Sequence, residues 1–162
     1  MIRLLAGLAA GTLILAGCGA NATQKAAPAL LPVATLKSFS GGAPLDLRGL
    51  RGPAVVNVWA SWCGPCRREL PHYQAFASTH AKVKVLGIDF QDTRADKARE
   101  LIRQTGVRYP LYTDPGGVVR AHVLPEVLLV DPRGRVVYRK YVEIKSVGQL
   151  ERLVDEHLGA GA

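Results

Sequence analysis

The chain has 162 residues, of which 48% are hydrophobic and 21% are charged. These values exclude a disordered chain and a multi-span membrane protein, and the length suits one domain with residues to spare. The formal net charge is +8 at pH 7. Because the Lys and Arg residues are scattered, without a tight basic block or interleaved aromatics, we expect a solvated basic surface and no nucleic-acid partner. Weak attraction to anionic lipid headgroups is the alternative interpretation of this charge.

The N-terminus has the pattern of an export signal. Arg3 is followed by an apolar stretch over residues 4–16, which is too short to span a bilayer comfortably. The stretch ends in Leu-Ala-Gly before Cys18, which resembles a bacterial lipobox. We therefore predict a lipoprotein signal peptide over residues 1–17 and a lipid on Cys18. An ordinary signal peptide cleaved nearby and an uncleaved anchor are the alternatives.

Residues 18–35 read as a lipidated tether. They are rich in Ala and carry Pro28 and Pro32, which is typical of a flexible linker. The folded domain is expected over residues 36–162. Two or more acyl chains anchor a protein stably, so we expect the domain to remain at the extracytoplasmic face of the cell membrane.

The first half of the domain predicts four elements in chain order. A small hairpin is expected from residues 36–39 and 45–47, followed by a buried, β-branched strand over residues 55–59. A helix opens near Arg67, is expected to kink at Pro71, and resumes through His80. A second strand follows over residues 83–89.

The second half predicts two further helices, a short helix and three strands. Thr93 has the position of an N-cap for a helix that stops at Gly106. The segments that follow are a short strand over residues 109–112, a short helix over 118–122, and a hairpin of strands 126–131 and 136–142. Ser146 and Gln149 have capping-box spacing for the last helix. This order predicts an α/β fold with a central mixed sheet, helices on both faces, and a short N-terminal hairpin extension.

The chain has three cysteines, Cys18, Cys63 and Cys66. This odd number is explained if Cys18 carries lipid and the other two exchange electrons. Cys63 lies where a strand gives way to a helix, and the unpaired amides and macrodipole at a helix N-terminus favour a thiolate. Cys66 follows by nearly one turn, so it can resolve a mixed disulfide formed on Cys63.

The residues between the two cysteines suit this turn. Gly64 allows a tight backbone, and Pro65 fits a first helical turn. Alternatives for the pair are a permanent structural disulfide and a structural zinc site, which would need two more ligands. A c-type haem site would need His after Cys66, where Arg67 stands.

The segment Val-Asn-Val-Trp-Ala-Ser-Trp-Cys-Gly-Pro-Cys over residues 56–66 resembles the thioredoxin superfamily, specifically its exported TlpA-like branch. That branch includes membrane-tethered oxidoreductases of cytochrome c maturation. The resemblance extends from about residue 36 to residue 158. It implies a thioredoxin fold whose only redox group is the disulfide of Cys63 and Cys66, with no cofactor and no metal.

The resemblance also implies roles for further residues. Pro125 matches the cis-proline of this fold, and the backbone of Leu124 would pair with substrate; a trans proline starting an edge strand is the alternative. Trp62, Gly64 and Pro65 would line the same substrate site. Asp92 is the candidate for shuttling a proton to or from Cys66, although a plain helix-start acid is an equal alternative.

Some positions depart from the branch or stand in for its usual residues. Asn57 lies where cytosolic thioredoxins keep a buried aspartate. Val123 and Val127 replace a usual glycine and threonine, and Val123 in place of glycine is expected to narrow the groove. Glu126 directly follows the proline, where it reads either as a group that recognises substrate charge or as an exposed strand-end acid.

We therefore expect an enzyme that reduces disulfides of exported proteins, apocytochrome c among the candidates, with electrons from a membrane donor protein. A disulfide-forming oxidase is one alternative. A copper carrier that uses Cys63, Cys66 and a histidine is an alternative of another class.

Overall fold

The structure is a computed structural model that describes residues 29–159. The predicted signal peptide over residues 1–17 and the predicted lipidation at Cys18 therefore lie outside the described residues. So does most of the predicted tether.

The described chain forms eight strands and three helices. In chain order these are β1 (Ala29–Leu30), β2 (Thr35–Ser38), β3 (Leu45–Asp46), β4 (Ala54–Trp59), α1 (Gly64–Thr79), β5 (Lys84–Phe90), α2 (Ala95–Thr105), β6 (Leu111–Asp114), β7 (Glu126–Val130), β8 (Arg135–Tyr141) and α3 (Val147–Leu158). The predicted hairpins, the strands before and after the long first helix, and the last helix are confirmed. Helix α1 continues through Pro71 as a single helix from Gly64 to Thr79.

The strands form one mixed sheet in the order β1-β8-β7-β4-β5-β6-β2-β3. Strand β4 is central: it pairs in parallel with β5 and antiparallel with β7. All six residues of β4 are buried, as expected of a central strand covered on both faces, and five of them are apolar. This confirms the mixed α/β architecture, with β4 leading directly from the core to the two cysteines.

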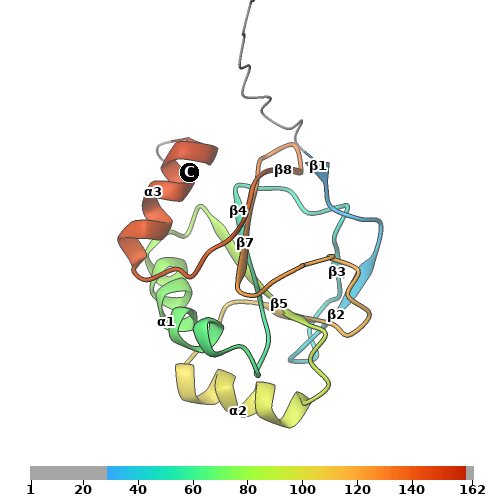
Figure 1. The fold of residues 1–162 in the computed structure, drawn as a ribbon. Helices are drawn as coiled ribbons and strands as arrows, with labels where there is room; N and C mark the ends of the chain where they lie inside the picture. Colours follow the sequence, from blue (N-terminus) through green and yellow to red (C-terminus); the bar gives the residue numbers. More distant parts are fainter. Residues whose placement is uncertain (1–28, 160–162) are drawn as a thin grey trace, which may run out of the picture.

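The helices gather around α1. Strands β4, β5 and β6 follow one another across the sheet, so right-handed crossovers put α1 and α2 on the same face. Helix α3 packs against α1, and Figure 1 shows α1 and α3 on one side of the central strands with the β2–β3 hairpin on the other. The active-site helix is thus held between two others.

The short helix predicted over residues 118–122 is wrong, because this segment forms turns. Asp114 accepts hydrogen bonds from the amides of Val118 and Val119 at 2.8 and 2.9 Å. Arg120 has φ 57°, outside the right-handed helical region. Arg139 donates to the carbonyls of Val119 and Arg120. Residues 118–122 therefore add no helix to the fold.

The sheet begins inside the stretch predicted as a tether. Ala29 and Leu30 pair with Val136 and Arg135 at the edge of β8, and Leu31 is buried in the core. The β2–β3 hairpin then joins the far edge through β6. Residues 29–35 thus belong to the folded domain. They run from the β8 side of the sheet, where β1 pairs, to the β6 side, where β2 begins.

Helix α2 starts differently from the sequence-based prediction. Its N-cap is Arg94, which makes no side-chain capping bond, so the predicted cap at Thr93 is wrong. Asp92 accepts from the Arg94 amide at 2.9 Å instead. The predicted stop at Gly106 is confirmed, since this residue adopts the left-handed conformation with φ 68°.

Candidate active site

The two cysteines lie where β4 gives way to α1. Cys63 is the N-cap of α1, with φ −85° and ψ 106°, and its Sγ accepts a hydrogen bond from the Cys66 amide at 3.2 Å. Pro65 lies in the first turn, where its missing N–H leaves no donor unsatisfied. The helix N-terminus therefore presents its donors and its partial positive charge to the Cys63 sulfur, as expected from the sequence.

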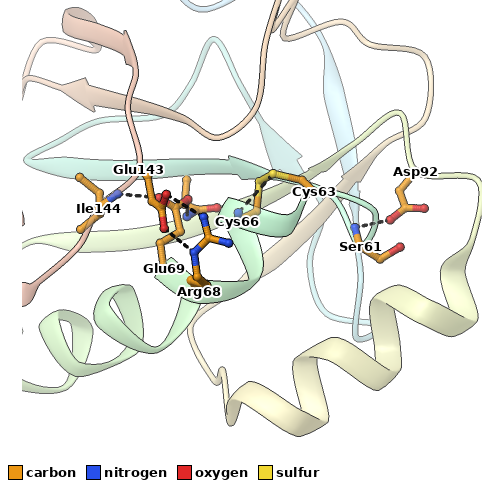
Figure 2. Close-up of a disulfide and its surroundings, with 9 residues drawn as sticks. Ser61, Cys63, Cys66, Arg68, Glu69, Asp92, Glu143 and Ile144 are labelled. Atoms are coloured by element: carbon orange, nitrogen blue, oxygen red, sulfur yellow. Dashed lines mark hydrogen bonds and ion pairs between the residues drawn. A yellow bond between two sulfur atoms is a disulfide. The ribbon is translucent and has the colours of Figure 1, made fainter.

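Cys63 and Cys66 are joined by a disulfide, with Cα atoms 5.3 Å apart. Figure 2 shows this bond at the start of α1. Cys66 is fully buried, whereas Cys63 keeps 4% of its surface exposed. Trp62, immediately before it, is 53% exposed. An incoming thiol or disulfide can thus approach only through Cys63.

The Leu124–Pro125 bond is cis, as the resemblance implied. Val58 pairs with Glu126 in the antiparallel ladder, so continuing this register sets Pro125 and Leu124 beside the chain that leads into Cys63. Val123 is 52% exposed at the same end of β7. The structure thus places these residues beside the segment that leads into Cys63, and their contact with substrate remains a prediction.

Glu126 is neither exposed nor free. It is 7% exposed, and its two carboxylate oxygens accept from Nε and Nη2 of Arg139 at 2.9 and 2.8 Å. The expectation of an exposed strand-end acid is therefore wrong. Because Arg139 neutralises this carboxylate, Glu126 presents no net charge for reading a substrate.

Glu69 is a functional candidate that sequence reasoning missed. It lies three residues after Cys66, hence on the same side of α1, and it is fully buried. Its oxygens accept from Asn57 Nδ2 at 3.0 Å and from the Ile144 amide at 2.9 Å. Burial raises the pKa of Glu69 to about 8, against the lowering effect of these two hydrogen bonds. The sequence signal that could have identified Glu69 is an acidic residue on the buried face of α1.

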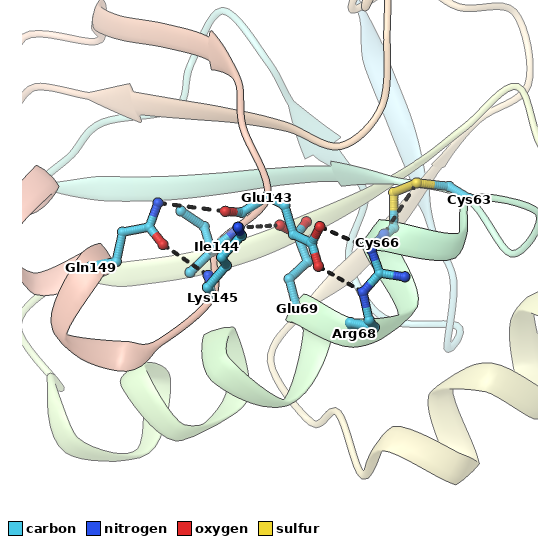
Figure 3. Close-up of polar contacts among 8 residues, drawn as sticks. All are labelled: Cys63, Cys66, Arg68, Glu69, Glu143, Ile144, Lys145 and Gln149. Carbon is cyan, nitrogen blue, oxygen red and sulfur yellow. Dashed lines mark hydrogen bonds and ion pairs between the residues drawn. A yellow bond between two sulfur atoms is a disulfide. The ribbon is translucent and has the colours of Figure 1, made fainter.

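The loop between β8 and α3 closes over this carboxyl group. Beside the Glu69–Ile144 bond, Arg68 donates to both oxygens of Glu143 at 2.8 and 2.9 Å. Gln149 accepts from the Lys145 amide at 2.8 Å, and Figure 3 shows these contacts running from α1 to the start of α3. Two neighbouring side chains of α1 thus fasten the helix to a segment about 75 positions away in sequence.

Asp92 lies against the loop that precedes Cys63. Its Oδ2 accepts from the Ser61 amide at 2.6 Å, and Figure 2 shows it on the Cys63 side of the disulfide. The neighbouring Asp89 is buried, and burial together with the charge of Asp92 raises the pKa of Asp89 to about 8. A role for Asp92 in moving the Cys66 proton remains a prediction. Glu69 lies three residues after Cys66 on α1, and Figure 2 shows it on the opposite side of the disulfide from Asp92.

In residues 29–159, no group of three or more His, Cys, Asp or Glu side chains is placed to hold a metal ion. In the same part of the chain, no helix is long and apolar enough to cross a membrane.

Residues 25–139 match the AhpC/TSA family. Among curated relatives, the thiol-disulfide oxidoreductase ResA of Bacillus thuringiensis is 28% identical over 103 residues, which cover 59% of this chain and 59% of the relative. The thiol:disulfide interchange protein HelX of Rhodobacter capsulatus is 31% identical over 115 residues, covering 67% and 64%. For three ResA relatives from Bacillus species, the match spans 59% to 66% of their length.

Solved structures agree with the observed fold. The structure of MTB dsbF in its mixed oxidised and reduced forms superimposes with a TM-score of 0.68 at 25% identity, covering 76% of this chain and 94% of that one. The thioredoxin fold and the resemblance described from residues 56–66 are thereby confirmed.

Proposed function

Since the chain belongs to the AhpC/TSA family, we propose that it acts as a thiol–disulfide oxidoreductase through Cys63 and Cys66. The observation that carries this proposal is the placement of Cys63 as the N-cap of α1, disulfide-bonded to a buried Cys66. A structural disulfide needs no such helix terminus at its outer sulfur. The names of the relatives ResA and HelX describe the same chemistry.

In the reduced protein, the Cys63 thiolate attacks one sulfur of a substrate disulfide. The substrate S–S bond breaks, a mixed disulfide forms, and the departing substrate sulfur takes up a proton. Cys66 then loses its proton and attacks Cys63 Sγ, which releases the second substrate thiol. In total, two electrons pass from the enzyme to the substrate. The enzyme loses two protons, one when Cys63 ionises and one from Cys66, and the two departing substrate sulfurs take up two protons. The helix N-terminus favours the Cys63 thiolate that starts the reaction.

The buried side of the pair supplies a proton acceptor. Glu69 lies one turn beyond Cys66, and a carboxyl group whose pKa is about 8 exchanges a proton readily near neutral pH. Only the ionised form of Glu69 can accept a proton, and we assign to it the acceptance of the Cys66 proton as Cys66 attacks the mixed disulfide. Asn57 positions this carboxyl group through its amide hydrogen bond.

The direction of transfer is proposed to be reduction of disulfides in exported proteins, with apocytochrome c among the substrates. The Gly64–Pro65 pair between the cysteines, similar to that of reducing thioredoxins, supports this direction. A reductase outside the cytoplasm needs electrons from a membrane donor protein, and a lipid on Cys18 would hold the enzyme beside it. Changing Cys18→Ser should then move the protein from the membrane to the soluble fraction, and unchanged partitioning would argue against lipidation.

Trapping tests the exchange itself. Because Cys66→Ser removes the resolving sulfur, mixed disulfides through Cys63 should accumulate in cells and disappear on treatment with dithiothreitol. The matched control is the double variant Cys63→Ser/Cys66→Ser, which should trap nothing. If the single variant traps no more partner than the double one, Cys63 is not the attacking group and the proposal fails.

A further inference from the structure

A cleft of about 430 Å³ opens beside the disulfide, between the start of α1 and the length of α2. It is lined by Ser61, Trp62, Arg67, Arg94, Lys97, Glu100, Leu101 and Gln104. Ser61 and Trp62 immediately precede Cys63, so the cleft begins within two residues of the attacking sulfur. A group bound here would therefore lie close to the Cys63 sulfur and would belong to the molecule that reacts with it.

The cleft is electropositive. Three of its side chains are cationic, Arg67, Arg94 and Lys97, and only Glu100 is anionic. Glu100 is already engaged by Lys97, with Nζ and Oε2 3.3 Å apart. Among the ion pairs of residues 29–159, none includes Arg67 or Arg94. Two guanidinium groups are therefore available to an anion, and guanidinium matches a carboxylate with two parallel hydrogen bonds.

Ser61 supplies a second, independent indication of a ligand. Its side-chain Oγ is buried and has no hydrogen-bond partner, and the residue is only 8% exposed. Figure 2 shows Ser61 on the side of the disulfide where α2 lies. The Ser61 amide is already used by Asp92, so the hydroxyl is the polar side-chain group of this cleft residue that lacks a partner. A buried hydroxyl without a partner is unfavourable unless a bound group satisfies it.

We propose that this cleft binds a carboxylate from an acidic segment of the protein whose disulfide is exchanged. Arg67 and Arg94 pair with the carboxylate, the Ser61 hydroxyl donates to it, and Trp62 packs against the neighbouring apolar atoms. The cleft thus selects substrates that carry Asp or Glu within a few residues of the reacting cysteine. This inference rests on the proposed exchange at Cys63 and specifies the substrate class. A small carboxylate-bearing disulfide such as glutathione disulfide offers the same chemistry from another source.

The test compares three disulfide peptides with the reduced, full-length protein in neutral detergent. The peptides are identical except for two positions near the reacting cysteine, which hold Glu, Gln or Lys. We expect kcat/KM for the Glu peptide to exceed that for the Lys peptide by about tenfold at low salt, because each partly exposed ion pair contributes about twofold to fivefold. The ratio should shrink in high salt, which screens exposed charges.

Charge reversal identifies the cleft as the source of this preference. The double variant Arg94→Glu/Lys97→Glu should abolish or invert the ratio. The control Lys82→Glu/Arg103→Glu changes the net charge equally at exposed positions outside the cleft, and it should keep the ratio within about twofold of wild type. Ser61→Ala should slow the Glu peptide by about threefold and leave the Lys peptide unchanged, as expected for one lost hydrogen bond.

Each outcome decides between distinct possibilities. Equal rates on all three peptides overturn the acidic-segment proposal and leave exchange at Cys63 intact, whereas no turnover of any peptide means that the proposed function itself has failed. A ratio that falls equally in the control variant also overturns the proposal, because overall charge would then explain it. If Arg94→Glu/Lys97→Glu slows glutathione disulfide as much as the Glu peptide, the cleft serves the small molecule and the assignment to a protein segment is wrong.

Discussion

The two sulfurs of the disulfide lie in opposite surroundings. On the Cys63 side, an exposed Trp62 and an open, basic cleft lie next to the bond. On the Cys66 side, Glu69 and Asn57 are fully buried, and the loop after β8 closes over them. One side offers charge and access to a partner, while the other keeps a carboxyl group away from water.

This difference separates two tasks within a single turn of helix. Recognition needs exposed groups that a partner can reach, and an exposed carboxylate would stay ionised near neutral pH. Proton transfer near neutral pH needs a carboxyl group whose pKa is raised, which burial provides for Glu69. The asymmetry therefore predicts that variants on the two sides change different measurements.

The largest expected effect lies on the closed side, in Glu69→Gln. Folding raises the pKa of Glu69 from 4.5 to about 8, so the folded protein binds a proton that the unfolded chain releases between these pH values. The wild-type free energy of unfolding should therefore fall as pH rises from about 4.5 to 8, by up to about 5 kcal/mol from this group. Glu69→Gln should remove that part of the slope in urea unfolding measured across this pH range.

The control for this experiment is Glu156→Gln, at an exposed position on α3. It should leave the pH slope unchanged, and Asp89 contributes equally to all three proteins. A slope in Glu69→Gln as steep as that of wild type would show that Glu69 titrates normally, and the contrast between the two sides would be lost.

A smaller effect is expected on the open side, in Trp62→Ala. Trp62 is 53% exposed, so the free energy of unfolding should change by less than about 0.5 kcal/mol. The kcat/KM for a disulfide peptide should fall by about tenfold, because the apolar surface beside Cys63 is lost. Val33→Ala, at an 80% exposed position in the N-terminal segment, should alter neither quantity. A stability loss as large as that of a core variant would contradict the assignment of Trp62 to recognition.

The smallest effect concerns the loop that covers Glu69. Ser146 caps α3 by accepting from the Gln149 amide at 3.2 Å, and Ser146→Ala should lower the free energy of unfolding by about 1 kcal/mol. Ser78→Ala, which removes an exposed hydroxyl inside α1, should lower it by about 0.5 kcal/mol or less. Equal losses in both variants would mean that the cap does not stabilise this loop.

The open side could be predicted largely from sequence because its determinants are local. The β-branched run of β4 and the Cys63-Gly64-Pro65-Cys66 turn each depend on residues within a few positions of one another. The cis bond at Pro125 was also expected from the resemblance. These features are fixed by short-range stereochemistry and by the helix terminus, which a reader of the sequence can recognise.

The closed side could not be predicted in the same way. The hydrogen bond from the Ile144 amide to Glu69 joins residues 75 positions apart, and no pattern of neighbouring residues predicts it.

The helix predicted over residues 118–122 does not form, because Asp114 and Arg139 make hydrogen bonds with the backbone of this segment. The neutralisation of Glu126 by Arg139 likewise depends on the pairing of β7 with β8.

Redox titration of the intact protein in glutathione buffers tests the central claim most directly. If Cys63 and Cys66 exchange electrons, their thiols should convert reversibly in a two-electron transition. Its midpoint should lie between about −120 and −270 mV, and a value below about −230 mV would indicate a reductase. A disulfide that stays closed at potentials below about −300 mV would be a structural bond, and the account of this site would be contradicted.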